Sequence, residues 1–335
     1  MAERSWRPSD AILRRIKGFV RCVVEDVASN RSLSIPLDRY RNYCSDPSGS
    51  CICSSGLPCG KEIILLEKES HAYRLDVLLN VLLIVQRLLQ ENKHGSKRDI
   101  YYMKPSFFRE QAVVDRAIND ICILLKCSRH NLNVVPVGKG LVMGWLKFIE
   151  GGREIYCIRN PNTAYPIPVS VEDVEGIVSV ARYILVVEKE TGKIDVLFLR
   201  HLVDQLQLPV FCLVDSDPYG FDILTIYRFG SLQMAYDAKL MCVPDIRWLG
   251  VFPSEFEKYQ VPDRCLLQLT PEDKKKAQAM MLRCYLRQEA PQWRFELEIM
   301  LQKGVKFEIE ALSVSSLSFL SEEYIPAKIQ HGEHV

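Results

Sequence analysis

The chain has 335 residues, of which 48% are hydrophobic and 25% charged, and its 43 basic and 42 acidic residues leave a net charge of +1. This balance excludes a wholly disordered, collagen-like or membrane-spanning protein, and the length predicts two domains. Because there is no overall basic excess, a nucleic-acid partner has to be argued from local sites. The longest apolar run, residues 77–89, contains polar residues and is too short to cross a bilayer, so we expect no membrane partner.

Twelve cysteines occur in a chain whose first residues are charged and lack an apolar signal core. We therefore expect reduced thiols and a protein of the cytosol or nucleus. Four of the cysteines, Cys44, Cys51, Cys53 and Cys59, lie in a segment rich in Ser, Gly and Pro. They can be imagined as a zinc site, but the paired knuckles of zinc frameworks are missing, and this favours a disordered loop.

Hydrophobic periodicity predicts helices in the first half of the chain, over residues 12–27, 75–89 and 114–125. Residues 41–60 between the first two helices form a linker, and Ser128 can cap a further short helix. Two strands are predicted around the turn Gly138-Lys139-Gly140. Residues 70–150 are thus consistent with a helix-turn-helix carrying a wing, a module that binds DNA or other proteins.

From about residue 165 onward the pattern becomes that of an α/β domain. Two short apolar runs, YILVVE at 183–188 and PVFCLVDSD at 209–217, each end in acid, and a helical stretch at 196–206 separates them. Buried parallel strands joined by a helical crossover have this pattern. The final third of this domain, which includes PQWRFELEIMLQKGVKFEIEALS, is predicted to be helical and is rich in charge.

Acidic residues follow both of these predicted strands. Glu188 ends the first run, and Asp215 and Asp217 end the second. Ligands collect at the carboxyl ends of strands in open α/β sheets, and clustered carboxylates select hard cations such as Mg²⁺. The alternative for a D-x-D sequence is an ordinary loop turn, and the third acid on the neighbouring strand raises the case for a metal site.

A second candidate site is the segment KHGSKRDIYYMKPSFFR at 93–109, where basic residues flank a tyrosine pair. Basic groups interleaved with aromatic rings suit a phosphate backbone. A tyrosine hydroxyl can also attack phosphorus, but with a pKa of about 10 it needs a neighbouring cation or base, and Arg98 is close enough in sequence. The alternative is a buried aromatic pair beside a solvated basic turn.

The segment KRDIYYMKPSFFREQAVVDRAINDICILLKCSRHNLNVV resembles the A subunit of topoisomerase VI and its eukaryotic meiotic double-strand-break relatives. So do YILVVEKE, FCLVDSDPYGFDI, PDIRWLG and KFEIEALS, which occur in the family order. Together they cover most of residues 70–330, and the likeness is greatest to the first plant paralogue. The resemblance implies a winged-helix domain at 70–150 and a toprim α/β domain at 165–335, preceded by a helix and flexible linker at 1–69.

The resemblance also implies roles for single residues. Tyr102 matches the family nucleophile, which leaves Tyr101 structural, and Arg98 matches the arginine that orients phosphate. Glu188, Asp215 and Asp217 match the toprim ligands of Mg²⁺. Lys139, in the turn of the wing, matches a position expected to touch DNA, and we expect the following cations to line the same groove: Lys97, Arg98, Lys104 and Arg109.

The implied reaction is cleavage of double-stranded DNA through a 5′-phosphotyrosyl intermediate, which starts meiotic recombination in the nucleus. In the family, tyrosine and metal come from different subunits, so a homodimer or a heterodimer with a paralogue is required. The family also works with an ATP-binding B-type subunit, which the helix at 12–27 is placed to contact.

One departure from the family pattern concerns the toprim domain. Glu188 and Asp215 are only 27 positions apart. A helical crossover fits this interval, but the family's additional strand does not, because a βαβ unit takes about 30 residues or more. We therefore expect a toprim domain shortened by one strand, and the alternative function is a catalytically weak or inactive DNA-binding partner subunit. A nuclease that uses metal-activated water instead of Tyr102 is a third hypothesis.

Overall fold

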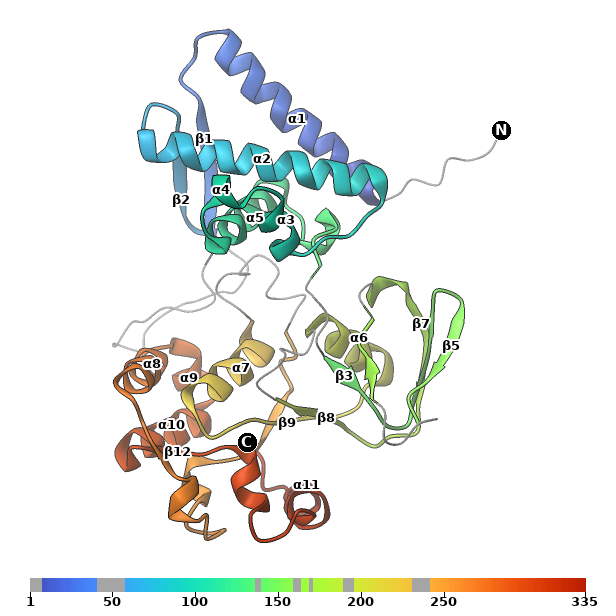
Figure 1. Cartoon of the computed structure of the whole chain (residues 1–335), viewed down its shortest axis with the longest axis vertical. Coiled ribbons are helices and arrows are strands. Elements are labelled where there is room, and N and C mark those ends of the chain that lie inside the picture. The colour runs from blue at the N-terminus through green and yellow to red at the C-terminus, as the bar shows by residue number, and fades with distance from the viewer. Residues whose placement is uncertain are drawn as a thin grey trace. The chain divides into compact units, whose positions relative to one another are not determined.

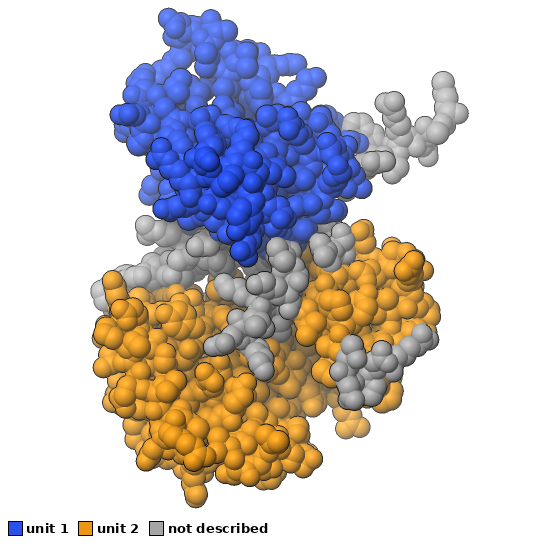
Figure 2. All heavy atoms as spheres, viewed as in Figure 1, with its two compact units in different colours: residues 1–41, 56–137, 232–237 blue, residues 42–55, 138–231, 238–335 orange. Residues whose placement is uncertain are grey.

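The computed structural model describes residues 8–40, 58–135, 140–158, 164–168, 171–188, 196–230 and 242–335. The chain divides into two compact units, which are coloured separately in Figure 2. The described residues up to 135 belong to the first unit and those from 140 onward belong to the second. Each unit has its own buried core, so each is described by itself.

The first unit is mainly helical. Its elements, in chain order, are α1 (Pro8–Ala28), β1 (Ser34–Tyr40), β2 (Pro58–Leu65), α2 (Glu69–Glu91), α3 (Lys97–Met103), α4 (Pro105–Phe108), α5 (Gln111–Leu125) and a 3₁₀ turn at His130–Leu132. Figure 1 shows α2 between α1 on one side and the group α3 to α5 on the other. The helices predicted at 12–27, 75–89 and 114–125 are confirmed by α1, α2 and α5.

The core of the first unit lies between α2 and α5. Leu78, Val81 and Val85 of α2 are fully buried, and they belong to the same cluster as Ile118 and Ile121 of α5. These residues recur every three or four positions, so one face of each helix is continuously apolar. Burial of these stripes is the main source of stability for helices that would be marginal alone.

A two-stranded antiparallel sheet, β1 with β2, accompanies these helices and was not predicted. In β1, Ile35 and Leu37 are buried while their neighbours face outward, which is the alternation of a strand with one buried face. The residues that join the two strands, including Cys44, Cys51 and Cys53, lie outside the described residues, as does the Cys59 side chain. The zinc and loop interpretations of the cysteine cluster therefore both remain predictions.

Two strands are predicted around the turn Gly138-Lys139-Gly140, and the described residues on its two sides have different backbone partners. Val134, on its first side, forms a parallel bridge with Gly95. The strand on its second side, β3 (Leu141–Val142), pairs with β6 (Tyr165–Pro166) instead. Residues 136–139 themselves lie outside the described residues. Long-range backbone partners were thus available to both segments, and periodicity cannot reveal such partners.

The second unit is larger, and its described residues form helices and four small sheets. Besides β3 and β6, its elements are β4 (Leu146–Glu150), β5 (Arg153–Tyr156), β7 (Val174–Ser179), β8 (Ile184–Val187), α6 (Val196–Leu206), β9 (Val210–Leu213), α7 (Pro218–Phe229), β10 (Arg247–Gly250), β11 (Leu267–Gln268), α8 (Pro271–Met281), α9 (Cys284–Gln288), α10 (Pro291–Lys303), β12 (Val305–Lys306) and α11 (Ile325–His331). A π-helical turn, Leu320–Tyr324, precedes α11, and short 3₁₀ turns join several of the others.

A parallel sheet with the order β10-β9-β8 is the centre of this unit. All four residues of β9 are buried, as expected for a middle strand covered on both faces. The predicted parallel strands and the crossover helix α6 between them are confirmed. Among the described residues β8 and β9 are direct neighbours, paired from Ile184 with Val210 to Val187 with Leu213, so no gap separates the two acid-bearing strands.

A second sheet, antiparallel with the order β5-β4-β7, packs against the crossover helix. Phe148 of β4 and Phe198 of α6 are both buried, and their rings meet edge to face at 6.0 Å. This contact joins β4 to the helix between β8 and β9. It accounts for the place of the described residues 140–150 in the second unit, although the predicted winged-helix range 70–150 includes them.

No helix among the described residues is long and apolar enough to cross a membrane.

Gly250, at the end of β10, provides a stability prediction. A Cβ atom there would lie 2.0 Å from the hydroxyl of Tyr324, which is buried and donates a hydrogen bond to Glu255. Gly250→Ala is expected to lower the free energy of unfolding by about 3 kcal/mol or more, because overpacking adds to the strain of a positive φ.

The control is Gly304→Ala, which also has a positive φ but meets no atom within 4 Å. It should cost about 1 kcal/mol. Denaturant unfolding of both variants measures the difference, and equal losses would show that the Tyr324 hydroxyl does not restrict this position.

Candidate functional site

The helix that carries the tyrosine pair is α3, and a local motif fixes where it begins. The hydroxyl of Ser96 accepts a hydrogen bond from the Asp99 amide at 3.0 Å, and the Asp99 carboxylate accepts one from the Ser96 amide at 2.8 Å. This reciprocal capping box satisfies two amides that the helix itself leaves without partners. Ile100 is fully buried in the core, so the helix is also fixed in rotation.

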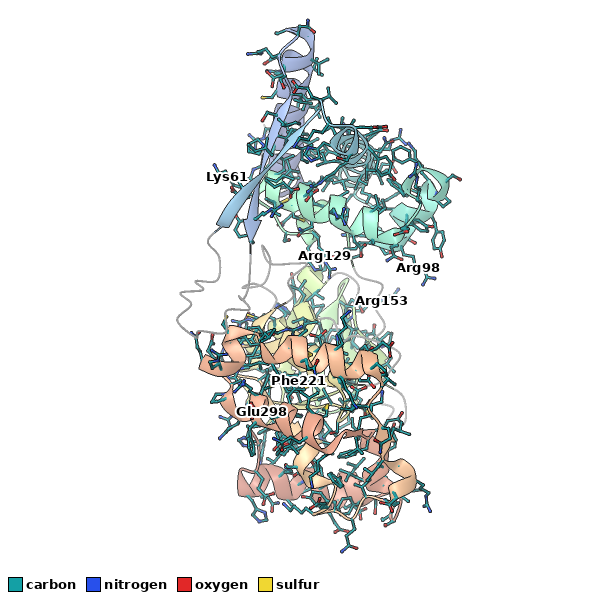
Figure 3. The ribbon with its side chains drawn as sticks, turned by 90° about the vertical axis from the view of Figure 1, so that its left-hand side faces the viewer. Lys61, Arg98, Arg129, Arg153, Phe221 and Glu298 are labelled. Atoms are coloured by element: carbon teal, nitrogen blue, oxygen red, sulfur yellow. The ribbon has the colours of Figure 1, made fainter. Side chains whose placement is uncertain are left out.

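Arg98 and Tyr102 lie on one face of α3, four residues apart. The Tyr102 side chain is 59% exposed, and Nη2 of Arg98 donates to its hydroxyl oxygen at 3.4 Å. The Arg98 guanidinium lies 5.7 Å from the centre of the Tyr102 ring, and this side chain extends away from the ribbon in Figure 3. The contact with the Tyr102 hydroxyl leaves other donors of the guanidinium for a phosphate group.

Tyr101 has a different environment from its neighbour. Its ring packs partly buried against the core, and its hydroxyl donates to the main-chain oxygen of Arg109 at 3.3 Å. The two tyrosine rings are 5.3 Å apart and tilted. Of the pair, Tyr102 is the one with an exposed hydroxyl beside a cation, and Tyr101 holds the chain that follows α3.

The other cations of this segment are not equivalent. Lys97 points inward and forms an ion pair with Asp115 of α5 at 3.7 Å, and burial lowers the pKa of its ammonium group. Lys104 and Arg109 are exposed. Lys104 donates to Asn80 at 2.8 Å, and the Arg109 guanidinium lies 5.2 Å from the centre of the Tyr73 ring. Lys97 is therefore the least available of them to a phosphate, and Lys139 lies outside the described residues.

In the second unit, Glu188, Asp215 and Asp217 line one cavity of about 520 Å³ at the carboxyl ends of β8 and β9. Glu188 directly follows β8, and its amide donates to the oxygen of Leu213 in β9 at 3.0 Å. The parallel register thus continues up to the first acid. The structure brings the three predicted acids together around one space.

The two aspartates are held by main-chain amides. Asp215 accepts a hydrogen bond from the Ile309 amide at 2.8 Å. Asp217 caps α7 by accepting from the amides of Tyr219 at 2.9 Å and Gly220 at 2.6 Å. A Cβ atom at position 220 would lie 2.7 Å from the oxygen of Asp215, so only glycine allows the helix to begin this close to the strand.

These acids are poorly solvated. Burial, together with the neighbouring carboxylates of Asp217, Glu310 and Glu308, raises the pKa of Asp215 to about 6, and the Ile309 amide opposes the shift. Burial also raises the pKa of Asp217, although the two amides at the start of α7 and the ammonium of Lys306 act against it. Desolvated carboxylates that lack enough positive charge favour a bound cation.

The donor chemistry fits a hard divalent cation, because all three predicted ligands offer carboxylate oxygen. Among the residues that the structure describes, however, no three His, Cys, Asp or Glu side chains stand close enough to hold one metal ion. In addition, Oδ1 of Asp217 already accepts hydrogen bonds from the first amides of α7. The acids therefore share a cavity without forming a closed ligand set.

Two charged residues of this cavity were not predicted from the sequence, Lys306 and Glu308. They come from the segment after α10, which reaches the D-x-D loop through an antiparallel bridge between Ser216 and Phe307. The bridge joins positions about 90 residues apart in the chain. A local sequence pattern carries no signal for such a contact.

The raised pKa of Asp215 predicts a pH-dependent stability. The folded state binds this proton more tightly than the unfolded state does, since its pKa is about 6 instead of 3.8. The free energy of unfolding therefore falls as the pH rises from about 4 to 6, and the whole penalty is present at pH 7.5. Asp215→Asn keeps an acceptor for the Ile309 amide and removes the charge.

In EDTA at pH 7.5 we expect Asp215→Asn to melt at a higher temperature than the parent chain, and near pH 4 the two should melt together. Calorimetric scans across this pH range measure the difference. A variant that is less stable than the parent at pH 7.5 would contradict the desolvation of Asp215.

Comparisons with known proteins give matches over both units. Residues 73–134 match the model of the family "Type IIB DNA topoisomerase". Residues 175–329 match the model of the Toprim domain that Spo11 shares with the A subunit of topoisomerase 6, a domain family that binds divalent metal. The first match contains α3 with Tyr102, and the second contains the acidic cavity.

Similar proteins cover nearly the whole chain. "Meiotic recombination protein SPO11-1" of Oryza sativa subsp. japonica is 61% identical over 354 residues, covering 97% of this chain and 93% of the relative. The protein of the same name from Arabidopsis thaliana is 60% identical, covering 96% of each chain. The A3 subunit of DNA topoisomerase 6 from Oryza sativa subsp. indica is 34% identical, covering 98% of this chain and 79% of the relative.

The alignment with the rice SPO11-1 protein spans 354 residues, more than the 335 of this chain. Within the aligned region the relative therefore has residues that this chain lacks. At 61% identity over nearly the full length, and with two family models matched in order, the relationship is unambiguous. The chain belongs to the family that unites Spo11 with the A subunits of topoisomerase VI, the type IIB topoisomerase A-like DNA-cleaving proteins.

Proposed function

We propose that this chain is a DNA-cleaving transesterase that makes meiotic double-strand breaks in the nucleus, with Tyr102 as its nucleophile. The observation that carries the proposal is the exposed Tyr102 hydroxyl with the Arg98 guanidinium 3.4 Å away. The names of the rice and Arabidopsis relatives support the meiotic role.

The chemistry follows from this pair. The Tyr102 oxygen attacks a backbone phosphorus, the new oxygen–phosphorus bond forms, and the bond from phosphorus to the 3′ oxygen breaks. The proton lost by the Tyr102 hydroxyl is balanced by one gained by the departing 3′ oxygen, which leaves as a hydroxyl. The 5′ phosphate stays on the tyrosine. Arg98 stabilises the phenolate and orients the phosphate oxygens. The phosphotyrosine keeps the bond energy, so cleavage needs no cofactor to drive it.

The acidic cavity supplies the second part of the proposal. Glu188, Asp215 and Asp217 are the residues that would hold Mg²⁺, which prefers carboxylate oxygen and octahedral coordination. When bound, this ion supplies charge neutralisation of the phosphate and of the departing oxygen. Burial raises the pKa of Asp215 and of Asp217, because their charged carboxylates are poorly solvated, and a bound cation would offset this cost.

The partners are double-stranded DNA, an ATP-binding B-type subunit, and a second subunit of the A type. Arg98, Lys104 and Arg109 are exposed on the tyrosine-bearing segment and suit a phosphate backbone. Lys97 and Lys139 remain proposed contacts, the first despite its ion pair with Asp115. A winged-helix arrangement of residues 70–150 and a toprim domain from 165 onward, shortened by one strand, belong to the same proposal.

A second candidate function is a DNA-binding partner subunit without cleavage activity. Two observations favour it. The three acids do not form a closed ligand set among the described residues, and the chain lacks residues that its rice relative has. Such a subunit would keep Tyr102 and the DNA contacts but would not hold the metal.

The nucleophile is tested with a matched pair of variants. Purified chain with its B-type partner is incubated with duplex DNA and Mg²⁺, and protein joined to 5′ ends is measured on denaturing gels. Tyr102→Phe should abolish the adduct, because it removes the attacking oxygen. Tyr101→Phe should retain it, since that hydroxyl only contacts the oxygen of Arg109. An adduct that survives Tyr102→Phe would refute the assignment, and so would one lost only in Tyr101→Phe.

The two candidate functions differ in metal binding. If the chain is an active subunit, calorimetric titration with Mg²⁺ should show binding that is weakened at least tenfold by Glu188→Gln or Asp215→Asn. These substitutions remove one charge each and change the side-chain volume little. No binding by the parent chain would favour the partner-subunit function.

A further inference from the structure

Lys306 is the cation that the described residues contribute to the wall of the acidic cavity. It ends β12, and the next residue, Phe307, exchanges two main-chain hydrogen bonds with Ser216, at 2.9 and 3.2 Å. Ser216 lies between the two aspartates of the D-x-D sequence. The bridge therefore fixes the backbone of Lys306 beside the acids.

The ammonium group of Lys306 is held in one place. Its Nζ lies 2.7 Å from Oδ2 of Asp273, whose side chain is only 2% exposed. Asp273 is itself fixed, because it forms a capping box with Thr270 at the start of α8. The Lys306 side chain stays 20% exposed. A cation anchored by a buried acid, yet open on one side to a cavity, is prepared to meet an anion there.

The charges around this cavity require such a group. Glu188, Asp215, Asp217 and Glu308 bring four negative charges to its wall. One divalent ion leaves the wall negative, and a phosphodiester adds another negative charge. An ammonium group has three donors, and the contact with Asp273 uses one of them. The remaining donors can form charge-assisted hydrogen bonds with phosphate oxygens.

We propose that Lys306 binds a backbone phosphate of DNA at the acidic cavity and that Asp273 is the residue that positions it. This inference rests on the proposed function, because it takes DNA as the ligand. It adds a phosphate contact to the metal-binding half of the protein, on a residue distant in sequence from the tyrosine segment. Lys306 thus acts beside the metal as the second positive charge that a phosphate needs in this site.

The competing explanation is that the ion pair of Lys306 with Asp273 only joins β12 to α8. A structural ion pair changes the melting temperature when it is broken, but it does not change how DNA affinity depends on salt. A phosphate contact changes that dependence, since each neutralised phosphate contributes about 0.9 to the slope of log affinity against log salt.

The experiment uses the full chain in a Tyr102→Phe background, so that binding is measured without cleavage. Fluorescence anisotropy with a labelled duplex and Mg²⁺ is recorded over a series of KCl concentrations. Lys306→Met should reduce the slope by about one and weaken binding several-fold at low salt. Lys306→Arg, which keeps the charge, should retain the slope.

Lys303→Met is the matched control. Lys303 ends α10, three residues before Lys306, and it pairs with Glu257 at 2.7 Å outside the cavity lining. Its removal should leave the slope unchanged. A slope that falls equally in both variants would mean a general loss of charge and would overturn the proposal.

A loss of folding is controlled by a double variant. Lys306→Met leaves the buried Asp273 without its cation, so Lys306→Met with Asp273→Asn removes both charges and keeps the capping oxygen. This double variant should also lose about one unit of slope. An unchanged slope in both forms overturns the inference. Adduct formation is measured separately with the chain that keeps Tyr102. If this chain binds DNA but forms no adduct, cleavage is refuted. If it does not bind DNA at all, both the proposed function and this inference are overturned.

Discussion

The direct pairing of β8 with β9 decides where the acidic side chains of the second unit lie. Four consecutive residue pairs join the two strands, and the Glu188 amide extends the register by one more bond. Neighbouring strands lie about 4.8 Å apart, so acids that follow both strands must share one edge of the sheet. A strand inserted between them would double that separation. The short interval between Glu188 and Asp215 is therefore compatible with one acidic cavity.

The same arrangement makes the cavity costly for the fold. Burial and mutual repulsion raise the pKa of Asp215, and the D-x-D loop is stabilised mainly by amides from α7 and from Ile309. A bound cation would therefore stabilise these buried carboxylates more than it would stabilise carboxylates exposed to water. In the first unit the reactive group depends on local interactions instead: the capping box of Ser96 fixes α3, and α3 presents Tyr102 with Arg98. The acidic cavity and the Tyr102–Arg98 pair are therefore each formed by residues of a single unit.

Sequence periodicity was sufficient for α2, α5 and β9, because each buries a continuous set of apolar residues. The strand β8 was predicted from its apolar run as well, although of its four residues only Val186 is buried. Periodicity missed α3, which has seven residues and a single buried one, Ile100; the available signal was Ser96 followed three residues later by Asp99. It did not reveal that the strand at 141–142 pairs with residues 165–166. Lys306 could not be predicted as part of the acidic cavity, since its place depends on a bridge to Ser216.

The central claim is that Tyr102 becomes covalently bound to DNA, and mass spectrometry of the attachment site tests it most directly. After cleavage and nuclease treatment, tryptic digestion yields the peptide from Asp99 to Arg109, because trypsin does not cut between Lys104 and Pro105. Fragmentation of this peptide should place a nucleotide on Tyr102 and leave Tyr101 unmodified. A nucleotide on Tyr101, or on no residue of this peptide although 5′ ends carry protein, would contradict the proposed mechanism.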